Sequence, residues 1–114
     1  MSGIGYIANA NIPYDFYSGN AVSIGTDIYL LGGNNSQTSN YKYNTDTGIY
    51  TKLTDIPYNS MHSSAVVIGT DIYIFGSNYS SSYYKYAYKY NTLNDTYTKL
   101  TDIPYYFYKH IYNN

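Results

Sequence analysis

The sequence predicts an all-β protein built from two copies of a four-stranded unit, and three observations support this prediction. The 114-residue chain has 20 Tyr and no Glu, Arg, Cys or Trp, so the usual residues of helix surfaces are scarce. Ile, Tyr and Thr favour strands, and the abundant Asn, Ser and Gly favour turns. The same segments recur along the chain, and apolar or alternating runs lie between turn signals. A hydrophobic content of 44% argues against disorder.

Two long matches define the internal repeat. Residues 21–29 recur as 65–73 with one substitution, at an offset of 44, and residues 50–58 recur letter for letter as 97–105, at an offset of 47. The change of offset places three additional residues between Gly76 and Ala87. Two copies this similar over most of the chain indicate a duplicated structural unit.

Each copy is expected to form four short strands. The first two are apolar runs separated by a Gly-Thr-Asp turn, and the third alternates Tyr with Lys, which places the rings on one face of the sheet. The fourth ends before an Ile-Pro step, because Pro cannot donate to a strand ladder. The predicted ranges are 20–25, 28–31, 41–43 and 50–53 in the first copy, and 64–69, 72–75, 84–90 and 97–100 in the second.

A repeated four-stranded unit of this length is typical of β-propeller blades. We therefore predict a single repeat unit over residues 1–114. Its parts are a partial repeat and connection at 1–18, blade 1 at 19–58, blade 2 at 59–105, and the stub of a further repeat at 106–114. The two blades then leave two apolar outer faces uncovered, and such faces normally mark association surfaces. The missing blades come either from a longer chain or from further copies of this one.

Several spacings resemble the kelch-repeat family of β-propellers. Gly32-Gly33 follows the second strand, where that family has a Gly pair, although the second copy has Gly76-Ser77. The Tyr and Trp that the family places seven residues apart correspond to Tyr43 with Tyr50 and Tyr90 with Tyr97, so Tyr replaces Trp. The resemblance implies a propeller in which three chains supply six blades, with four chains and eight blades as an alternative. It also implies that these residues pack between blades: Tyr43, Tyr50, Phe75, Tyr90 and Tyr97.

The connections between strands are the expected binding region, because loops on a rigid scaffold commonly carry recognition. The loops at 33–40 and 77–83, together with the Pro-Tyr connections, are polar and carry hydroxyls, amides and rings. This chemistry suits a glycan or a protein surface better than a phosphate. The candidate residues are Tyr14, Asn34, Asn35, Tyr58, Asn59, His62, Asn78 and Tyr79.

Charge and motifs argue against several other functions. Six Lys and seven Asp give a net charge of -1, which does not favour nucleic-acid binding. The chain has no Cys and no recognisable ligand spacing around His62 or His110, so we expect neither a metal nor a cofactor. It has neither a signal-peptide pattern nor the roughly 18 consecutive apolar residues of a membrane span, so we expect no membrane partner and a cytoplasmic location.

The sequence therefore favours a non-enzymatic propeller scaffold that associates with itself, a trimer being the expected form, and that binds a glycan or a protein. The first alternative is part of a kelch-type sugar-processing enzyme, an isomerase or lyase relying on His62 and Asp residues. The second is a purely structural repeat fragment without a ligand. Fold class alone does not decide between these functions.

Overall fold

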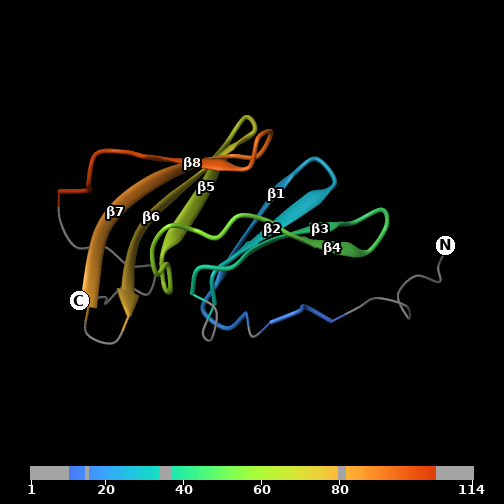
Figure 1. The fold of residues 1–114 in the computed structure, drawn as a ribbon, viewed down its shortest axis with the longest axis horizontal. Helices are drawn as coiled ribbons and strands as arrows, with labels where there is room; N and C mark the ends of the chain where they lie inside the picture. The colour runs from blue at the N-terminus through green and yellow to red at the C-terminus, as the bar shows by residue number, and fades with distance from the viewer. Residues whose placement is uncertain (1–10, 15, 34–36, 80–81, 105–114) are drawn as a thin grey trace.

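The computed structural model describes residues 11–14, 16–33, 37–79 and 82–104. These residues form eight strands and no helix, which confirms the predicted all-β class. The strands are β1 (Asn20–Ile24), β2 (Asp27–Leu31), β3 (Asn40–Asn44), β4 (Ile49–Lys52), β5 (Ser64–Ile68), β6 (Asp71–Tyr79), β7 (Ser82–Asn91) and β8 (Thr96–Lys99) (Figure 1). No helix able to cross a membrane is found in these ranges.

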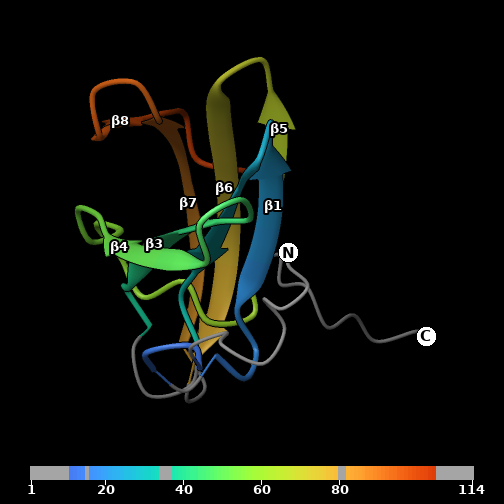
Figure 2. The same ribbon diagram turned by 90° about the vertical axis from the view of Figure 1, so that its right-hand side faces the viewer.

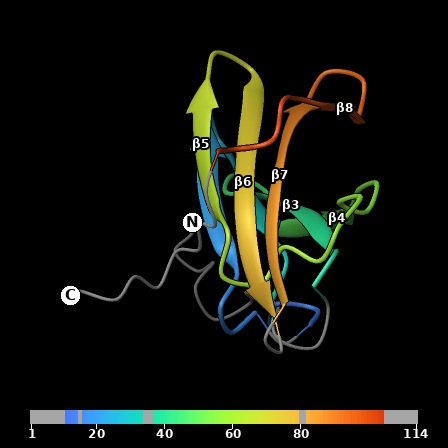
Figure 3. The same ribbon diagram turned by 90° about the vertical axis from the view of Figure 1, so that its left-hand side faces the viewer.

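The strands form two antiparallel sheets in simple chain order, β1-β2-β3-β4 and β5-β6-β7-β8. Each sheet is one propeller blade, as the repeat predicts, and we call them blade 1 and blade 2. The innermost strands β1 and β5 lie side by side, as Figures 2 and 3 show. The two blades therefore meet face to face around their first strands.

The two blades use the same turns because the turn residues are duplicated. Gly25 and Gly69 have φ angles of 60° and 64° in the turns between the first two strands, a conformation that glycine adopts without steric cost. After the third strands, the side-chain oxygens of Asn44 and Asn91 each accept two backbone N–H bonds from the following turn. Such Asn-centred turns are a local property of the sequence.

The hairpin between β6 and β7 differs from the prediction. We predicted a loop at 77–83, but pairing resumes after a register shift between Phe75 and Ser77 and continues to the pair Tyr79 and Ser82. Gly76 lies at this shift with a φ of 67°. In blade 1 the equivalent Gly32, with a φ of 73°, is where the chain leaves the sheet. The three additional residues of the second copy allow the strands to pair again beyond the bulge.

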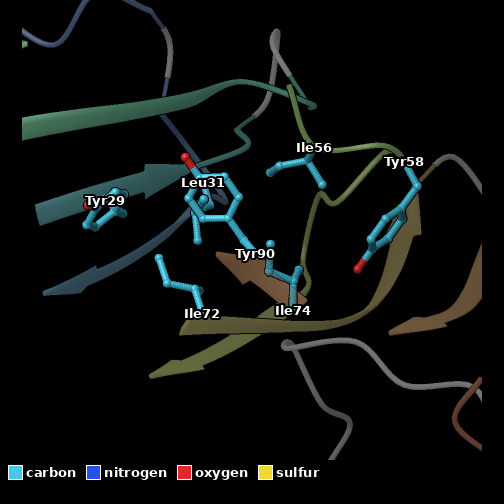
Figure 4. Packing of buried hydrophobic residues seen from close by; sticks show 7 residues of the cluster. All are labelled: Tyr29, Leu31, Ile56, Tyr58, Ile72, Ile74 and Tyr90. Carbon is cyan, nitrogen blue, oxygen red and sulfur yellow. The ribbon is translucent and has the colours of Figure 1, made fainter. Parts of the chain in front are cut away.

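The hydrophobic core lies between the two blades rather than within either of them (Figure 4). Its buried cluster consists of Tyr29, Leu31, Ile56, Tyr58, Ile72, Ile74 and Tyr90. Burying a large apolar side chain contributes about 1.5–3 kcal/mol, so this cluster provides much of the stabilising contact between the sheets. The contact between blades is therefore also the core of the described structure.

The predicted ends of the repeat pattern fall largely outside the described residues. The stub at 106–114 and residues 1–10 of the first partial repeat lie there, as does Asp15. Residues 11–14 and 16–18 are described and lead into β1.

Candidate functional site

The contact between the blades, which we call the internal joint, joins one face of blade 1 to the opposite face of blade 2. Side chains alternate between the faces of a strand, so Tyr29 and Leu31 of β2 lie on the face of blade 1 that meets blade 2. Ile72 and Ile74 of β6 approach them from blade 2, and both are 0% exposed. The rings of Tyr29 and Tyr90 meet edge to face, with centroids 6.3 Å apart. The joint is thus an apolar, interdigitated contact.

The connection from β4 to β5 completes the internal joint. Ile56 is 1% exposed within it. The ring of Tyr58 stacks on Tyr88 at 5.6 Å, and its hydroxyl donates a 2.7 Å hydrogen bond to the Gly76 carbonyl. Burial raises the pKa of Tyr58 well above its ordinary value. The connection is therefore held against blade 2 by both packing and a hydrogen bond.

A polar contact links the turn between β7 and β8 to the segment that follows β4. One Asp95 carboxylate oxygen accepts a 3.1 Å hydrogen bond from the Thr54 backbone N–H, and the other accepts a 2.7 Å bond from the Thr54 hydroxyl. The Tyr90 hydroxyl also donates to this carboxylate, at 2.5 Å. Because Asp95 belongs to blade 2 and Thr54 follows β4 of blade 1, these bonds fix one blade against the other. We call this group the Asp95 clamp.

Two further residues extend the Asp95 clamp. The Tyr97 hydroxyl donates to the Thr54 carbonyl at 2.7 Å and accepts a 2.9 Å bond from the side-chain nitrogen of Asn40. Asn40 is 0% exposed. Desolvation alone would raise the pKa of Asp95, but the hydrogen bonds from Tyr90 and Thr54 hold it below its usual range. The clamp therefore favours the ionised carboxylate.

The other face of each blade has no second sheet against it in the described structure. The outer face of blade 2 carries Val66 and Ile68 of β5, which are 50% and 65% exposed. By strand alternation it also carries Tyr73 and Phe75 of β6. Among the five aromatic residues predicted to pack between blades, Tyr90 and Tyr97 thus lie in the internal joint, whereas Phe75 lies on this outer face.

The outer face of blade 1 carries the remaining two predicted packing residues. Tyr43 and Tyr50 are cross-strand partners whose ring centroids lie 4.7 Å apart. Tyr90 and Tyr97 make the same 4.7 Å contact in blade 2, where blade 1 covers it. The rest of this face includes the exposed Ala21 and Ser23 of β1.

A second candidate region is the rim, where the connections before β1 and β5 meet the ends of β2 and β6. The Tyr14 hydroxyl donates a 2.6 Å bond to the Gly32 carbonyl, as Tyr58 does to Gly76. Burial, together with neighbouring Tyr41, raises the pKa of Tyr14 well above its ordinary value. Tyr58, one of the predicted binding residues of the rim, is only 7% exposed and packs against blade 2.

His62 links the two blades at the rim. Its Nε2 lies 2.9 Å from the Ser18 hydroxyl. These two residues occupy equivalent positions in the two copies, and both have positive φ angles, 61° for His62 and 66° for Ser18. Few non-glycine residues adopt this conformation, so the connection turns the same way before both first strands. The pairing of these repeat-equivalent residues places His62 where the connections before β1 and β5 meet.

The structure locates only part of the remaining predicted rim. The Asn59 side chain accepts a 3.4 Å bond from the Met61 N–H. Asn34 and Asn35 lie outside the described residues, and for Asn78 and Tyr79 only the backbone pairing at the end of β6 is described. Within the described ranges, no group of three or more potential metal-ligating side chains is present.

Sequence reasoning missed the buried polar residues of the rim and of the clamp. The Asn20 side chain donates 3.0 and 2.8 Å bonds to the carbonyl and hydroxyl of Ser63, which is 0% exposed. The Ser60 hydroxyl donates to the Gln37 carbonyl at 2.9 Å. For the clamp, a signal was available in the differences between the two copies, because Asp95 corresponds to Gly48 and Asn40 to Ala87.

Comparison with known proteins supports the fold. The solved structure of YjhT is similar to this chain, with a TM-score of 0.77 and 22% sequence identity. The match covers 88% of this chain and 32% of that chain, so the chain spans about a third of the length of the structure that it matches. No family model matches the sequence, and no curated protein matches it. The similarity and the two described sheets together identify the fold as two four-stranded β-propeller blades.

Proposed function

We propose that this chain is a non-enzymatic binding scaffold of the kelch-like propeller type, and that it completes its propeller by self-association. The observation that carries the proposal is the contrast between the internal joint and the outer blade faces. Val22 and Ile24 of blade 1 pack against the buried core, whereas their equivalents in blade 2, Val66 and Ile68, are 50% and 65% exposed. Exposed apolar surface at positions that form an interface elsewhere in the same molecule favours association.

Three chains are the preferred number in the ring. The chain matches 32% of the length of the structure it resembles, so three two-blade units together have about that length. Closed cyclic assemblies are the usual form of a homo-oligomer. A ring of three chains leaves no blade face uncovered.

The ligand of such a scaffold would bind at the rim. Tyr17, in the connection before β1, is 70% exposed, and Ser18 and Asn59 of the two connections are partly exposed. A surface of hydroxyls, amides and an aromatic ring suits a glycan or a protein surface. We expect this function inside the cell, without nucleic-acid or membrane partners.

Analytical ultracentrifugation over a wide range of protein concentrations tests the self-association. The proposal expects a species heavier than one chain that dissociates on dilution into folded 13.0 kDa chains. A folded single chain at every concentration would refute it. Glycan-array binding, with a Tyr17→Ala variant as the control for the rim, tests the ligand class separately.

A further inference from the structure

We propose that copies of the chain join head to tail, with the outer face of blade 2 docking on the outer face of blade 1 of the next copy. In this contact, the two blade faces pack as they do in the internal joint, but the Asp95 clamp is absent. The contact between copies is therefore the weaker of the two. This inference rests on the proposed self-association and specifies its geometry.

The outer faces carry the same residue types that form the internal joint. On blade 2, Tyr73 and Phe75 occupy the positions that Tyr29 and Leu31 occupy in blade 1. On blade 1, the Tyr43–Tyr50 ring pair corresponds to the Tyr90–Tyr97 pair of blade 2, with the same centroid separation of 4.7 Å. Each outer face therefore presents one half of a contact that the molecule already makes internally.

The first strands give this contact a direction. In the internal joint, Val22 and Ile24 of β1 and Ala65 and Val67 of β5 pack against the same core, and the two strands lie side by side. On the outer faces, the bulky side chains Val66 and Ile68 belong to blade 2. The smaller Ala21 and Ser23, equivalent to Ala65 and Val67, belong to blade 1. Bulky residues meet small ones only when blade 2 docks on blade 1, which makes the contact heterologous.

The hydrogen-bond donor of the clamp, Thr54, has an equivalent at the outer face of blade 2. Thr101 occupies the position of Thr54, and the flanking backbone bonds are the same in both copies. Leu53 N–H donates to the Asn40 carbonyl at 2.8 Å, and Leu100 N–H donates to the Ala87 carbonyl at 2.7 Å. Thr101 is therefore placed to donate to an acceptor on the next copy.

The hydrogen-bond acceptor of the clamp, the Asp95 carboxylate, has no equivalent on blade 1. Gly48 stands where blade 2 has Asp95, and the two share a left-handed backbone, with φ angles of 72° and 60°. The outer face of blade 2 lacks a second polar group. Ala87 stands there at the position of Asn40, whose side chain donates to the Tyr97 hydroxyl in the internal joint. A joint between copies thus keeps the apolar packing and loses the carboxylate hydrogen bonds.

A mixing experiment tests the direction of docking. One variant, Val66→Lys with Ile68→Lys, disables the outer face of blade 2, and the other, Ala21→Lys with Ser23→Lys, disables that of blade 1. All four residues are exposed in the described structure, so both variants are expected to fold, which circular dichroism checks. Each variant alone should sediment as a single chain, and a mixture should form a one-to-one pair. The inference would be overturned if the Ala21→Lys, Ser23→Lys variant still dimerised alone, or if the mixture formed no pair.

A graft of the clamp tests the missing acceptor. Gly48→Asp should tighten the association of copies by about three- to tenfold, the value of one ordinary net hydrogen bond. Gly48→Asn is the matched control, because Asn tolerates the same backbone but carries no charge. Adding Thr101→Val to Gly48→Asp removes the hydroxyl donor and should reverse most of the gain. Equal association constants for Gly48→Asp and Gly48→Asn would overturn the assignment.

The outcomes separate the two proposals. If the wild-type chain remains a folded single chain at all concentrations, the proposed function fails and this inference fails with it. If the wild-type chain associates but the mixed variants form no pair, the head-to-tail geometry is wrong. If the variants pair but the graft has no effect, the assignment of the missing acceptor is wrong.

Discussion

The internal joint and the outer blade faces are built from nearly the same sequence, and they differ in what covers them. Tyr90 is 0% exposed under blade 1, whereas the equivalent Tyr43 has no second blade over it in the described structure. Duplicated sequence therefore gives duplicated strands, turns and ring pairs, because these depend on local residues. Burial depends on a neighbouring blade, which the described structure provides for the facing sides of the two blades but not for their outer faces.

The internal joint and the outer blade faces also differ in their polar residues. The Asp95 clamp exists at the internal joint and has no counterpart at the outer face of blade 1, where Gly48 takes its place. Apolar residues recur on the outer faces, but the hydrogen bonds of the clamp occur within the described structure at the internal joint alone. We therefore expect the proposed joint between copies to be weaker than the internal joint.

The largest expected effect comes from removing the same ring in the two environments. Tyr90→Ala should lower the free energy of unfolding by about 3–5 kcal/mol, because it empties a fully buried aromatic site. Tyr43→Ala, measured at protein concentrations where copies are dissociated, should cost only about 1 kcal/mol, mainly the loss of its contact with Tyr50. Urea denaturation followed by circular dichroism measures both. Equal losses would show that blade 1 does not provide the burial.

The Asp95 clamp gives a smaller effect. Asp95→Gly gives the internal joint the residue found at the equivalent position of blade 1 and should lower the free energy of unfolding by about 1–2 kcal/mol, because the hydrogen bonds of Thr54 and Tyr90 lose their acceptor. The same urea titration measures this loss. Asp46→Asn, at an exposed turn carboxylate of blade 1, is the matched control and should change little. A loss no greater than that of the control would contradict a role for the clamp.

A matched pair in the first strands tests coverage of the outer face. Ile24→Thr should lower the free energy of unfolding by about 1 kcal/mol at any protein concentration, because Ile24 packs against the core. Ile68→Thr should have almost no effect on the dissociated chain, since Ile68 is 65% exposed. At concentrations where copies associate, Ile68→Thr should weaken the association. A concentration-independent result for Ile68→Thr would argue that nothing covers this face.

The smallest effect is a pH dependence. The pKa of Asp95 is lowered in the folded chain, so the carboxylate stabilises the fold above its unfolded pKa of about 3.9. This contribution is lost as the pH falls through the lower folded value. As the pH is lowered from about 5 to about 3, the urea midpoint of the wild type should therefore fall more steeply than that of Asp95→Asn. Parallel curves for the two proteins would contradict the lowered pKa.

Most of the fold was predictable from the sequence because it depends on local patterns. The repeated Gly-Thr-Asp turns, the alternating Tyr residues and the Ile-Pro steps located all eight strands to within a few residues, except in the longer β6–β7 hairpin. There the extension depends on pairing beyond the bulge at Gly76, which no local turn signal in residues 77–83 indicated.

The candidate sites were less predictable because they depend on contacts between the copies. Tyr58, one of the predicted rim residues, is buried because the β4–β5 connection folds back onto blade 2. The clamp was not predicted because Asp95 reads as a turn residue until Thr54, which is 41 residues away, is seen beside it. Long-range pairs of this kind become visible only when the blades are docked.

Native mass spectrometry of the wild-type chain at high concentration tests the central claim most directly, because it counts the copies that cover the blade faces. Our account predicts a discrete complex of three chains, each of 13.0 kDa, with no larger species beyond it, since a closed ring has no free face. A folded single chain under conditions that preserve weak complexes, or an open series of growing lengths, would contradict it.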